Sequence, residues 1–192
     1  MGRGSPYPRH VRRIVIVGNS GSGKTTLAGI VAARLDVPHV ELDAHFHRAG
    51  WEPTPAPEFR AAVWAALDSA DAVAGGWVVC GNYRAVRSAV WARADTIVWL
   101  DLPRRHVMLR VSRRSLSRVA RGEELWNGNR ESLRNVLALH EPERSIIRWA
   151  WGGVHRYRRQ YEPMMSDPLW AGLGRYRLDS PRAVQAWIDG LG

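Results

Sequence analysis

Apolar residues along this chain of 192 residues fall into two alternating patterns. Short runs rich in β-branched residues predict buried strands, and stretches with apolar residues three or four positions apart predict helices. The predicted strands cover residues 12–17, 39–42, 77–80, 96–100 and 175–178. The predicted helices cover residues 25–35, 59–67, 85–92, 103–120 and 132–161, with a last helix after Ser180 and Pro181.

This alternation predicts an α/β protein with a parallel sheet that helices cover on both faces. Loops are predicted at residues 51–58, which are rich in proline, and at 123–131, which contain an Asn-Gly turn signal. Residues 1–11 are expected to form a flexible basic arm. Neither a repeat nor a linker divides the remainder, so residues 12–192 are expected to form a single domain.

The composition is that of a globular protein, with 45% hydrophobic and 24% charged residues. No apolar run is long enough to cross a bilayer, and the basic N-terminus lacks the apolar stretch of a secretory signal. The chain has one cysteine, Cys80, so an internal disulfide is excluded. We therefore expect a cytoplasmic protein without a membrane partner. The sequence does not give its oligomeric state.

A glycine-rich turn lies between the first predicted strand and the first predicted helix. It matches the pattern G-x-x-x-x-G-K-[ST] in full and reads Gly18-Asn19-Ser20-Gly21-Ser22-Gly23-Lys24-Thr25. In such a loop, backbone N–H groups turn towards phosphate oxygens, and the following helix adds its positive dipole end. Lys24 is expected to reach the outer phosphates and the Thr25 hydroxyl to hold magnesium, while Thr26 completes the predicted nucleotide-binding set.

This loop predicts ATP with Mg²⁺ as the bound nucleotide. ATPases, GTPases and kinases share it, so the loop does not define the reaction. GTP is disfavoured, because a guanine-reading Asn-Lys-x-Asp motif needs a second lysine and Lys24 is the only lysine in the chain.

Polar residues after the other strands are candidates for the acceptor side, because ligands of such sheets gather beyond the carboxyl ends of the strands. Asp43 comes just after the second strand, and we expect it to act as a catalytic base or as a magnesium anchor. Glu41 is a weaker alternative carboxylate. The other residues expected to contact the acceptor are His45, Phe46, Gly81, Asn82 and Arg84.

The charge pattern adds an arginine-rich helix. The formal net charge is +10, from 28 Lys and Arg against 18 Asp and Glu. Between Leu102 and Gly122 lie seven arginines and no acidic residue, and a bound anion stabilises such a stripe. We expect this helix to be a lid whose arginines neutralise the phosphoryl group during transfer.

A second basic cluster supports a different function. Arg156, Arg158 and Arg159 are interleaved with Tyr157 and Tyr161. Charge combined with aromatic rings is typical of surfaces that bind single-stranded nucleic acid. The alternative to a kinase is therefore a nucleotide-regulated protein that binds nucleic acid, with little or no phosphotransfer.

These motifs resemble those of the adenylate-kinase-like branch of P-loop kinases, and more narrowly the small bacterial adenylate kinase-related or DNA topology modulation proteins. The resemblance rests on GNSGSGKTT, ELDAHF, GNYRAVRSAVWARADTIVWLDLPR and EELWNGNRESLR, and it spans nearly the whole chain after residue 12. It implies a three-layer P-loop NTPase fold, with a five-stranded parallel sheet of the nucleoside-monophosphate-kinase type and an arginine-rich helical lid at about residues 104–161. It further implies that Asp43 faces the acceptor, that the segment Asp179 to Pro181, which includes Ser180, borders the adenine, and that the lid arginines are Arg110, Arg113 and Arg114.

One position departs from the family pattern. The third strand of such kinases usually ends in an acidic residue that helps to hold magnesium through water, and here that residue is Cys80. A thiol is a poor partner for Mg²⁺, which prefers oxygen ligands. Three explanations stay open: Asp43 or Asp101 substitutes, turnover is slow, or the protein binds nucleotide without transferring phosphate.

The sequence therefore predicts an ATP-dependent phosphotransferase that acts on a small molecule, namely a nucleotide, a nucleoside or another hydroxyl compound. Its predicted catalytic residues are Lys24, Asp43, Arg110, Arg113 and Arg114. Its predicted magnesium residues are Thr25, Asp43 and Asp101.

Overall fold

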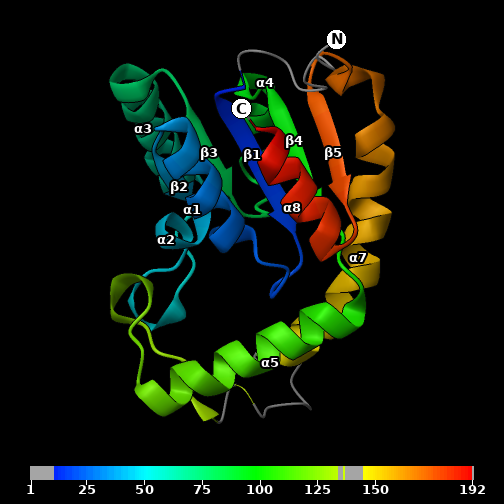
Figure 1. Cartoon of the computed structure of the whole chain (residues 1–192). Helices are drawn as coiled ribbons and strands as arrows, with labels where there is room; N and C mark the ends of the chain where they lie inside the picture. The colour runs from blue at the N-terminus through cyan, green and yellow to red at the C-terminus, as the bar shows by residue number, and fades with distance from the viewer. Residues whose placement is uncertain (1–10, 134–135, 137–144, 192) are drawn as a thin grey trace.

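The computed structural model describes residues 11–133, 136 and 145–191. Five parallel strands form one sheet in the order β2-β3-β1-β4-β5. Their carboxyl ends meet at one edge of the sheet (Figure 1). The strands are β1 (Arg13–Gly18), β2 (His39–Glu41), β3 (Trp77–Cys80), β4 (Thr96–Leu100) and β5 (Gly174–Leu178).

Helices connect these strands in the described part of the chain. The α-helices are α1 (Lys24–Leu35), α2 (Leu42–Phe46), α3 (Ala56–Ala74), α4 (Arg87–Arg93), α5 (Arg104–Arg121), α7 (Ile146–Ser166) and α8 (Pro181–Gly190). Short 3-10 turns are η1 (Ala49–Trp51), η2 (Trp126–Gly128) and η3 (Pro168–Trp170). Within the described ranges, no helix is long and apolar enough to span a bilayer.

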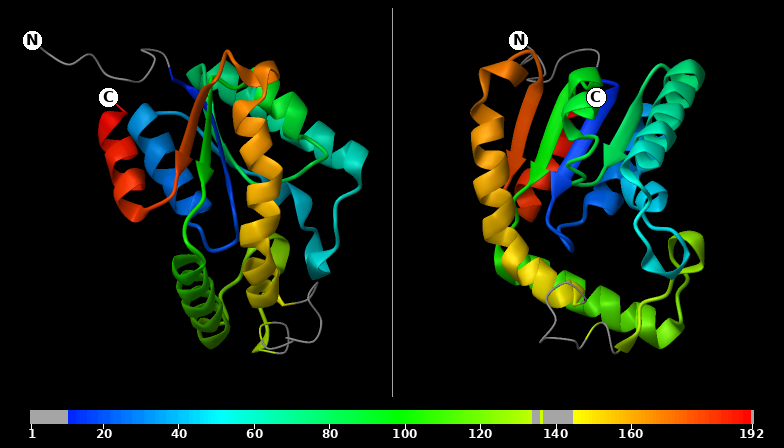
Figure 2. Two further views of the ribbon diagram at one scale, coloured as in Figure 1. Left: turned by 90° about the vertical axis from the view of Figure 1, so that its right-hand side faces the viewer. Right: turned by 180° about the vertical axis from the view of Figure 1, so that it is seen from behind.

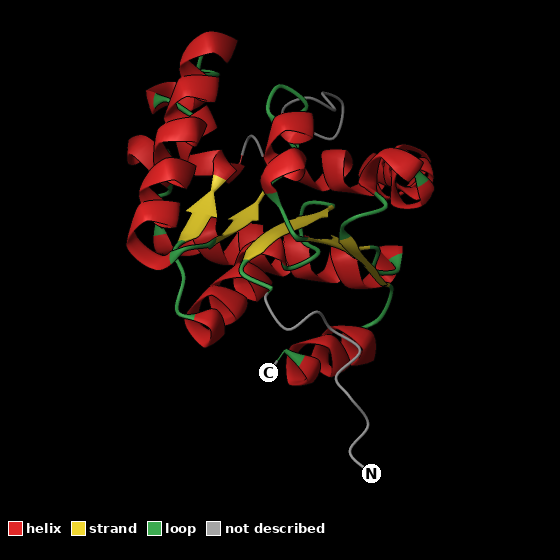
Figure 3. Ribbon diagram, turned by 90° about the horizontal axis from the view of Figure 1, so that it is seen from above, coloured by secondary structure: helices red, strands yellow, loops and turns green. Residues whose placement is uncertain are grey.

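The sheet and the helices on its two faces form three layers, with the sheet in the middle (Figure 3). Central strand β1 divides its side chains between the two faces, because successive residues of a strand point to opposite sides. Ile14 and Ile16 pack under α1 and α8, whereas Val15 and Val17 pack under α3, α4 and α7. Both faces of β1 are therefore core, which explains its nearly continuous apolar run.

Helix α5 lies across the carboxyl edge of the sheet, and α7 rises from it beside β5 (Figures 1 and 2). Val107 and Val111 of α5 form a buried cluster with Ala150 of α7. Gly21 of the glycine-rich loop abuts this helix, because a Cβ there would lie 2.8 Å from the Val107 carbonyl oxygen and 2.9 Å from the Val111 Cβ. Helices α5 and α7 thus pack directly against the glycine-rich loop.

The sheet confirms the fold predicted from the sequence: an α/β protein with a five-stranded parallel sheet and an arginine-rich helix at its carboxyl edge. Helix α3 begins at Ala56 rather than at residue 59, since Pro55 takes the N-cap position and Pro57 suits the first helical turn. It also runs on to Ala74, where Gly75 ends it in a left-handed conformation (φ 64°).

Two predictions fall partly on residues outside the described ranges. The predicted arm at 1–11 lies there except for Val11, and so does much of the first part of the predicted helix at 132–161. Within the described part, α7 begins at Ile146, where the Ser145 hydroxyl accepts a hydrogen bond from the Arg148 N–H. The single domain at 12–192 stays a prediction.

Candidate active site

A cavity of about 1880 Å³ opens at the carboxyl edge of the sheet. The glycine-rich loop, the ends of β2 and β3, helices α2, α5 and α8, and the η2 turn all contribute to its walls. Pockets for one small molecule usually measure about 300–1,000 Å³. This cavity is therefore large enough for two ligands side by side.

The loop presents an uncapped helix end to the cavity. Helix α1 begins at Lys24, and Gly23 before it has φ 95°, has no side chain to cap the helix, and precedes a first turn without acidic residues. The first N–H groups of α1 are thus left for a ligand, and the helix dipole favours an anion. The loop residues that line the cavity are Ser20, Gly21, Ser22, Gly23, Lys24, Thr25 and Thr26.

Gly18 and Asn19, also predicted to bind the nucleotide, do not line the cavity. Asn19 is 4% exposed, and its Nδ2 donates a hydrogen bond of 2.6 Å to the Ala150 carbonyl oxygen of α7. Gly18 is held by the side chain of Asn82. These two residues fix the loop to the rest of the fold.

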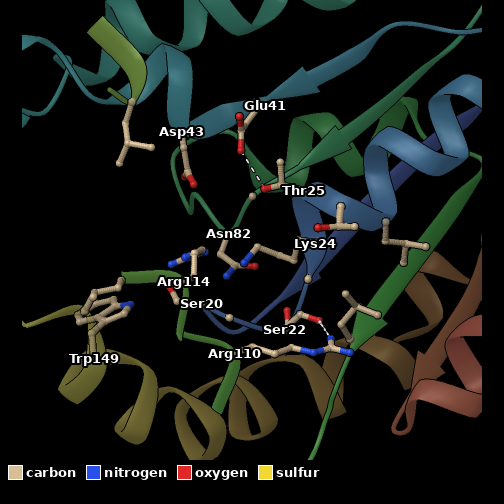
Figure 4. A pocket seen from close by; sticks show the side chains of 18 of the residues that line it. Ser20, Ser22, Lys24, Thr25, Glu41, Asp43, Asn82, Arg110, Arg114 and Trp149 are labelled. Atoms are coloured by element: carbon tan, nitrogen blue, oxygen red, sulfur yellow. Dashed lines mark hydrogen bonds between the residues drawn. The ribbon is translucent and has the colours of Figure 1, made fainter. Parts of the chain in front are cut away.

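Lys24 lies at the centre of the site (Figure 4). Its Nζ donates to the Asn19 carbonyl oxygen at 3.0 Å. Burial lowers the pKa of Lys24, and the nearby Asp43 charge opposes that shift. A phosphate beside the ammonium group would oppose this lowering of the pKa, so this lysine fits the predicted role.

The Thr25 hydroxyl lies against a carboxylate from β2. It donates a hydrogen bond of 2.8 Å to Glu41 Oε1, while the indole N–H of Trp126 donates to Glu41 Oε2 at 2.9 Å (Figure 4). A hydroxyl and a carboxylate are the oxygen ligands that Mg²⁺ prefers, and it usually keeps several waters in addition. In the described ranges, no group of three or more His, Cys, Asp or Glu residues could hold a metal. The Thr25–Glu41 pair is the arrangement that fits magnesium.

Cys80 also lies beside this pair, with its Sγ 3.8 Å from Thr25 Oγ1 and 3.2 Å from His39 Nε2. Burial and the Glu41 charge raise the pKa of the Cys80 thiol to about 12. The thiol is therefore neutral at physiological pH and supplies no anion. Glu41 instead supplies the carboxylate beside Thr25.

The structure does not bring Asp101, one of the expected magnesium residues, into the cavity. Asp101 is 5% exposed. Its Oδ1 accepts from Arg158 Nε at 2.8 Å, and its Oδ2 accepts from Arg177 Nη2 at 2.6 Å. Both oxygens are engaged in ion pairs that join α7 to β5, so Asp101 lies outside the cavity.

Asp43 lines the cavity at the start of α2. The Tyr83 hydroxyl donates to Asp43 Oδ1 at 2.5 Å. Burial and the Asp43 charge raise the pKa of Tyr83 well above its ordinary value, so the phenol keeps its proton and acts as the donor. Within the described residues, Oδ2 of Asp43 has no partner and can accept a proton from a ligand.

The other residues that were expected to contact the acceptor do not all line the cavity. Phe46, Gly81, Asn82 and Arg84 line the cavity, whereas His45 does not. Burial lowers the pKa of His45, and its backbone carbonyl oxygen accepts from Thr54 Oγ1 at 2.9 Å. His45 therefore supports the fold of this segment.

The three predicted lid arginines also differ in their position relative to the cavity. Arg110 Nη1 donates to the Ser22 carbonyl oxygen at 3.2 Å, and Arg114 projects into the cavity near Lys24 (Figure 4). Burial and the neighbouring Arg118 lower the pKa of Arg114. Arg113 is exposed and does not line the cavity. Two of the three predicted lid arginines thus line the cavity, and Arg110 contacts the loop.

Ser180 caps α8 by accepting a hydrogen bond of 3.2 Å from the Ala183 N–H. It does not line the cavity, but the next residue, Pro181, does, together with Val184 and Ile188 of the same helix. Of the segment expected to border the adenine, Pro181 therefore lines the cavity.

Sequence reasoning gave Glu41 only as a weaker alternative carboxylate, and it missed the contacts of Tyr83 and Trp126. Glu41 ends β2, and β2 ends at the same edge as the loop, so its place in the strand was a usable signal. The contacts of Tyr83 and Trp126 join segments 40 and 85 residues apart, and nothing in the local sequence gives such distances.

No known family model matches this sequence, and no curated protein matches it. Solved structures share its fold. A sugar kinase from a Janibacter species is 19% identical, with 95% of both chains covered and a TM-score of 0.52. A shikimate kinase from Acinetobacter baumannii in complex with shikimate is 16% identical, with 93% of this chain and 89% of that chain covered and a TM-score of 0.51. A gluconokinase from Sinorhizobium meliloti is 16% identical, with 96% and 93% covered and a TM-score of 0.50. The chain therefore has the P-loop fold of small kinases.

Proposed function

We propose that this protein transfers the γ-phosphoryl group of ATP to a small-molecule acceptor. The observation that carries the proposal is that the glycine-rich loop and the Asp43 carboxylate line one cavity, where the charge of Asp43 acts on Lys24 of the loop. The size of the cavity supports the simultaneous binding of nucleotide and acceptor.

The nucleotide half of the site holds the phosphates. The N–H groups at the start of α1 and the Lys24 ammonium group bind the phosphate oxygens. Arg110 and Arg114 approach from α5 and stabilise the charge on the phosphoryl group as it moves. Pro181, Val184 and Ile188 offer an apolar surface for the base.

Thr25 and Glu41 are the residues that would hold Mg²⁺. When bound, Mg²⁺ supplies positive charge to the phosphate oxygens. In this proposal, the carboxylate at the end of β2 takes the place of the acidic residue that Cys80 replaces at the end of β3.

The acceptor half of the site contains a carboxylate that can act as a base towards a hydroxyl group. Asp43 Oδ2 accepts the hydroxyl proton, the acceptor oxygen forms a bond to the γ-phosphorus, and the bond to the bridging oxygen breaks to leave ADP. Tyr83 fixes the other oxygen of the carboxylate. Phe46 and Arg84 are proposed to contact the acceptor. The names of the sugar kinase, shikimate kinase and gluconokinase support a hydroxyl compound, whereas the stretches GNY and LWNGNRE support the narrower adenylate kinase-related group.

Incubation with labelled ATP tests this function. The panel of acceptors contains nucleoside monophosphates, nucleosides, sugars and shikimate-like alcohols, and Lys24→Ala is the control. We expect labelled product with at least one acceptor and none with the variant. ATP hydrolysis that no acceptor changes would contradict phosphotransfer.

The alternative, nucleic-acid binding, has less support. Arg158 is paired with Asp101, Arg156 stacks on Trp149 with its Cζ 3.8 Å from the ring centre, and Tyr161 is fully buried. Arg156, Arg158 and Tyr161 therefore make contacts within the protein, whereas Arg159 is exposed. A gel shift with single-stranded DNA and RNA at two salt concentrations tests it, because electrostatic binding weakens steeply with salt. We expect no shift at low salt.

A further inference from the structure

A compact hairpin follows α5 and forms one wall of the cavity. Its two sides pair antiparallel at Glu124 and Arg130, and the Leu125 N–H donates to the Asn129 carbonyl oxygen at 2.7 Å. Asn127 and Gly128 at its tip have φ values of 57° and 78°, which suit an Asn-Gly turn. We name residues 123–131 the docking hairpin.

The docking hairpin is bound to the segment that carries Asp43. Asn129 is 4% exposed, and its side chain donates to the Arg48 carbonyl oxygen at 2.8 Å and accepts from the Trp51 N–H at 2.9 Å. Asn127 donates to the His47 carbonyl oxygen at 2.5 Å. In Figure 1 the hairpin lies beside α2 and η1.

The hairpin also holds this segment in an unusual conformation. Trp51 has φ 63°, which residues other than glycine rarely adopt, and Asn129 binds its N–H group. At its base, the hairpin is joined to α5 by Arg118, which pairs with Glu123 at 3.3 Å and with Glu131 at 3.1 Å. The hairpin therefore links α5 to the acceptor segment.

One side chain of the hairpin reaches the proposed magnesium site. The Trp126 indole N–H donates to Glu41 Oε2, while Glu41 Oε1 faces the Thr25 hydroxyl. The Trp126 ring stacks on His47 at 5.9 Å between ring centres and meets Trp51 edge to face at 6.4 Å, so its own position is fixed. An indole N–H is a donor only, and it can bind the carboxylate without competing for a metal ion.

We propose that Trp126 is a positioning residue that orients the Glu41 carboxylate towards the metal position beside Thr25. In this proposal, the docking hairpin makes the orientation of Glu41 depend on the segment that carries Asp43. The inference rests on the proposed function, because it concerns the magnesium that accompanies ATP. Groups that hydrogen-bond to a metal ligand set its orientation, and their loss typically weakens metal binding 10- to 100-fold.

The test measures binding rather than turnover. Isothermal titration with a non-hydrolysable ATP analogue is carried out in EDTA and with saturating Mn²⁺, and the ratio of the two affinities is the metal enhancement. Trp126→Phe keeps a ring but removes the N–H. We expect it to lower the metal enhancement about 10-fold while the affinity in EDTA stays that of the wild type. Trp151→Phe is the matched control, because Trp151 is 54% exposed and does not line the cavity, and it should leave both affinities unchanged.

A double-mutant cycle with Glu41→Gln shows whether Trp126 acts through Glu41. Glu41→Gln alone should lower the metal enhancement, and adding Trp126→Phe should lower it no further. A further loss of similar size would overturn the proposal, as would a normal enhancement in Trp126→Phe alone.

Two outcomes separate this inference from the proposed function. A wild-type protein that binds no nucleotide overturns both, whereas a wild type with metal-enhanced binding that Trp126→Phe leaves intact overturns only the positioning role. If Trp126→Phe also lowers the affinity for the ATP analogue in EDTA, the variant Asn127→Gly is used to test the proposal. It keeps the turn and Trp126 but removes the contact with His47. A reduced metal enhancement in Asn127→Gly supports the proposal, and an unchanged one overturns it.

Discussion

Asn82 binds both polar backbone groups of Gly18. Its Oδ1 accepts from the Gly18 N–H at 3.1 Å, and its Nδ2 donates to the Gly18 carbonyl oxygen at 2.6 Å. The Tyr161 hydroxyl donates to the same Oδ1 at 3.1 Å. Asn82 was expected to contact the acceptor. In the structure, it joins the end of β3 to the first residue of the phosphate-binding loop.

We therefore expect Asn82→Ala to loosen the loop. The substitution removes one partner from each of two Gly18 backbone groups, and a buried polar group left unsatisfied costs about 1–3 kcal/mol. Thermal unfolding should show a melting temperature lowered by several degrees, and titration should show weaker ATP binding. Asn82→Asp is the control of equal size, since it keeps the acceptor for the Gly18 N–H. If both variants bind ATP as the wild type does, Asn82 does not hold the loop in place.

Neutral substitutions of Asp101 and Glu41 should have different effects: the first should lower stability, and the second should weaken magnesium activation. Asp101→Asn weakens ion pairs with Arg158 and Arg177, so we expect a loss of about 2 kcal/mol and a melting temperature lower by roughly 4–8 °C, with an unchanged magnesium requirement. Glu41→Gln should weaken magnesium activation about 10-fold or more. The checks are calorimetry and a magnesium titration of activity. An altered magnesium requirement in Asp101→Asn would return that residue to the metal site.

Tyr83→Phe should slow the chemical step. The Tyr83 hydroxyl donates to Asp43 Oδ1, and a hydrogen bond to a charged group contributes about 1.5–3 kcal/mol, or roughly 10- to 100-fold. We expect kcat to fall by about that factor while KM for ATP stays constant, because Tyr83 has no contact with the loop. Steady-state kinetics with the acceptor found in the panel measures this effect. Tyr157→Phe, on a ring that also lines the cavity, is the matched control and should change kcat little.

The order of the strands and of the longer helices was readable from the sequence because both are set by local patterns, whereas the short helix α2 was not predicted. All five strands lie within one or two residues of their predicted positions. The β-branched run of β1 and the glycines after it specify a buried strand and a tight turn with no help from distant residues. The glycine-rich loop belongs to this class, since its conformation follows from its own glycines.

The distribution of roles among the charged residues was not readable in the same way. Asp101 and Glu41 both end or follow a parallel strand, so the sequence offers no reason to choose between them. Asp101 is neutralised by Arg177 of the neighbouring strand and by Arg158 of α7, which are 76 and 57 residues away along the chain. Only the packing of α7 beside β5 shows that Asp101 stabilises the fold and that Glu41 is left for the cavity.

Cys80 should be almost unreactive in the native protein. Burial and the Glu41 charge raise the pKa of its thiol from 9.0 to about 12. At pH 9 the thiolate fraction is then about 0.1% in the folded state and about half in the unfolded chain. Since the folded state binds this proton more tightly, the group adds stability below about pH 9, and its contribution is lost as the pH rises towards about 12.

We expect iodoacetamide at pH 9 to modify the native protein at least about 100-fold more slowly than the chain unfolded in guanidinium, with mass spectrometry as the readout. Cys80 is the only cysteine in the sequence, so each added carbamidomethyl group reports on this one site. Cys80→Ser is the control for modification of other groups. Similar rates in the two states would mean that the thiol is accessible and ionised in the native protein. In that case Cys80, rather than Glu41 alone, would contribute negative charge beside Thr25.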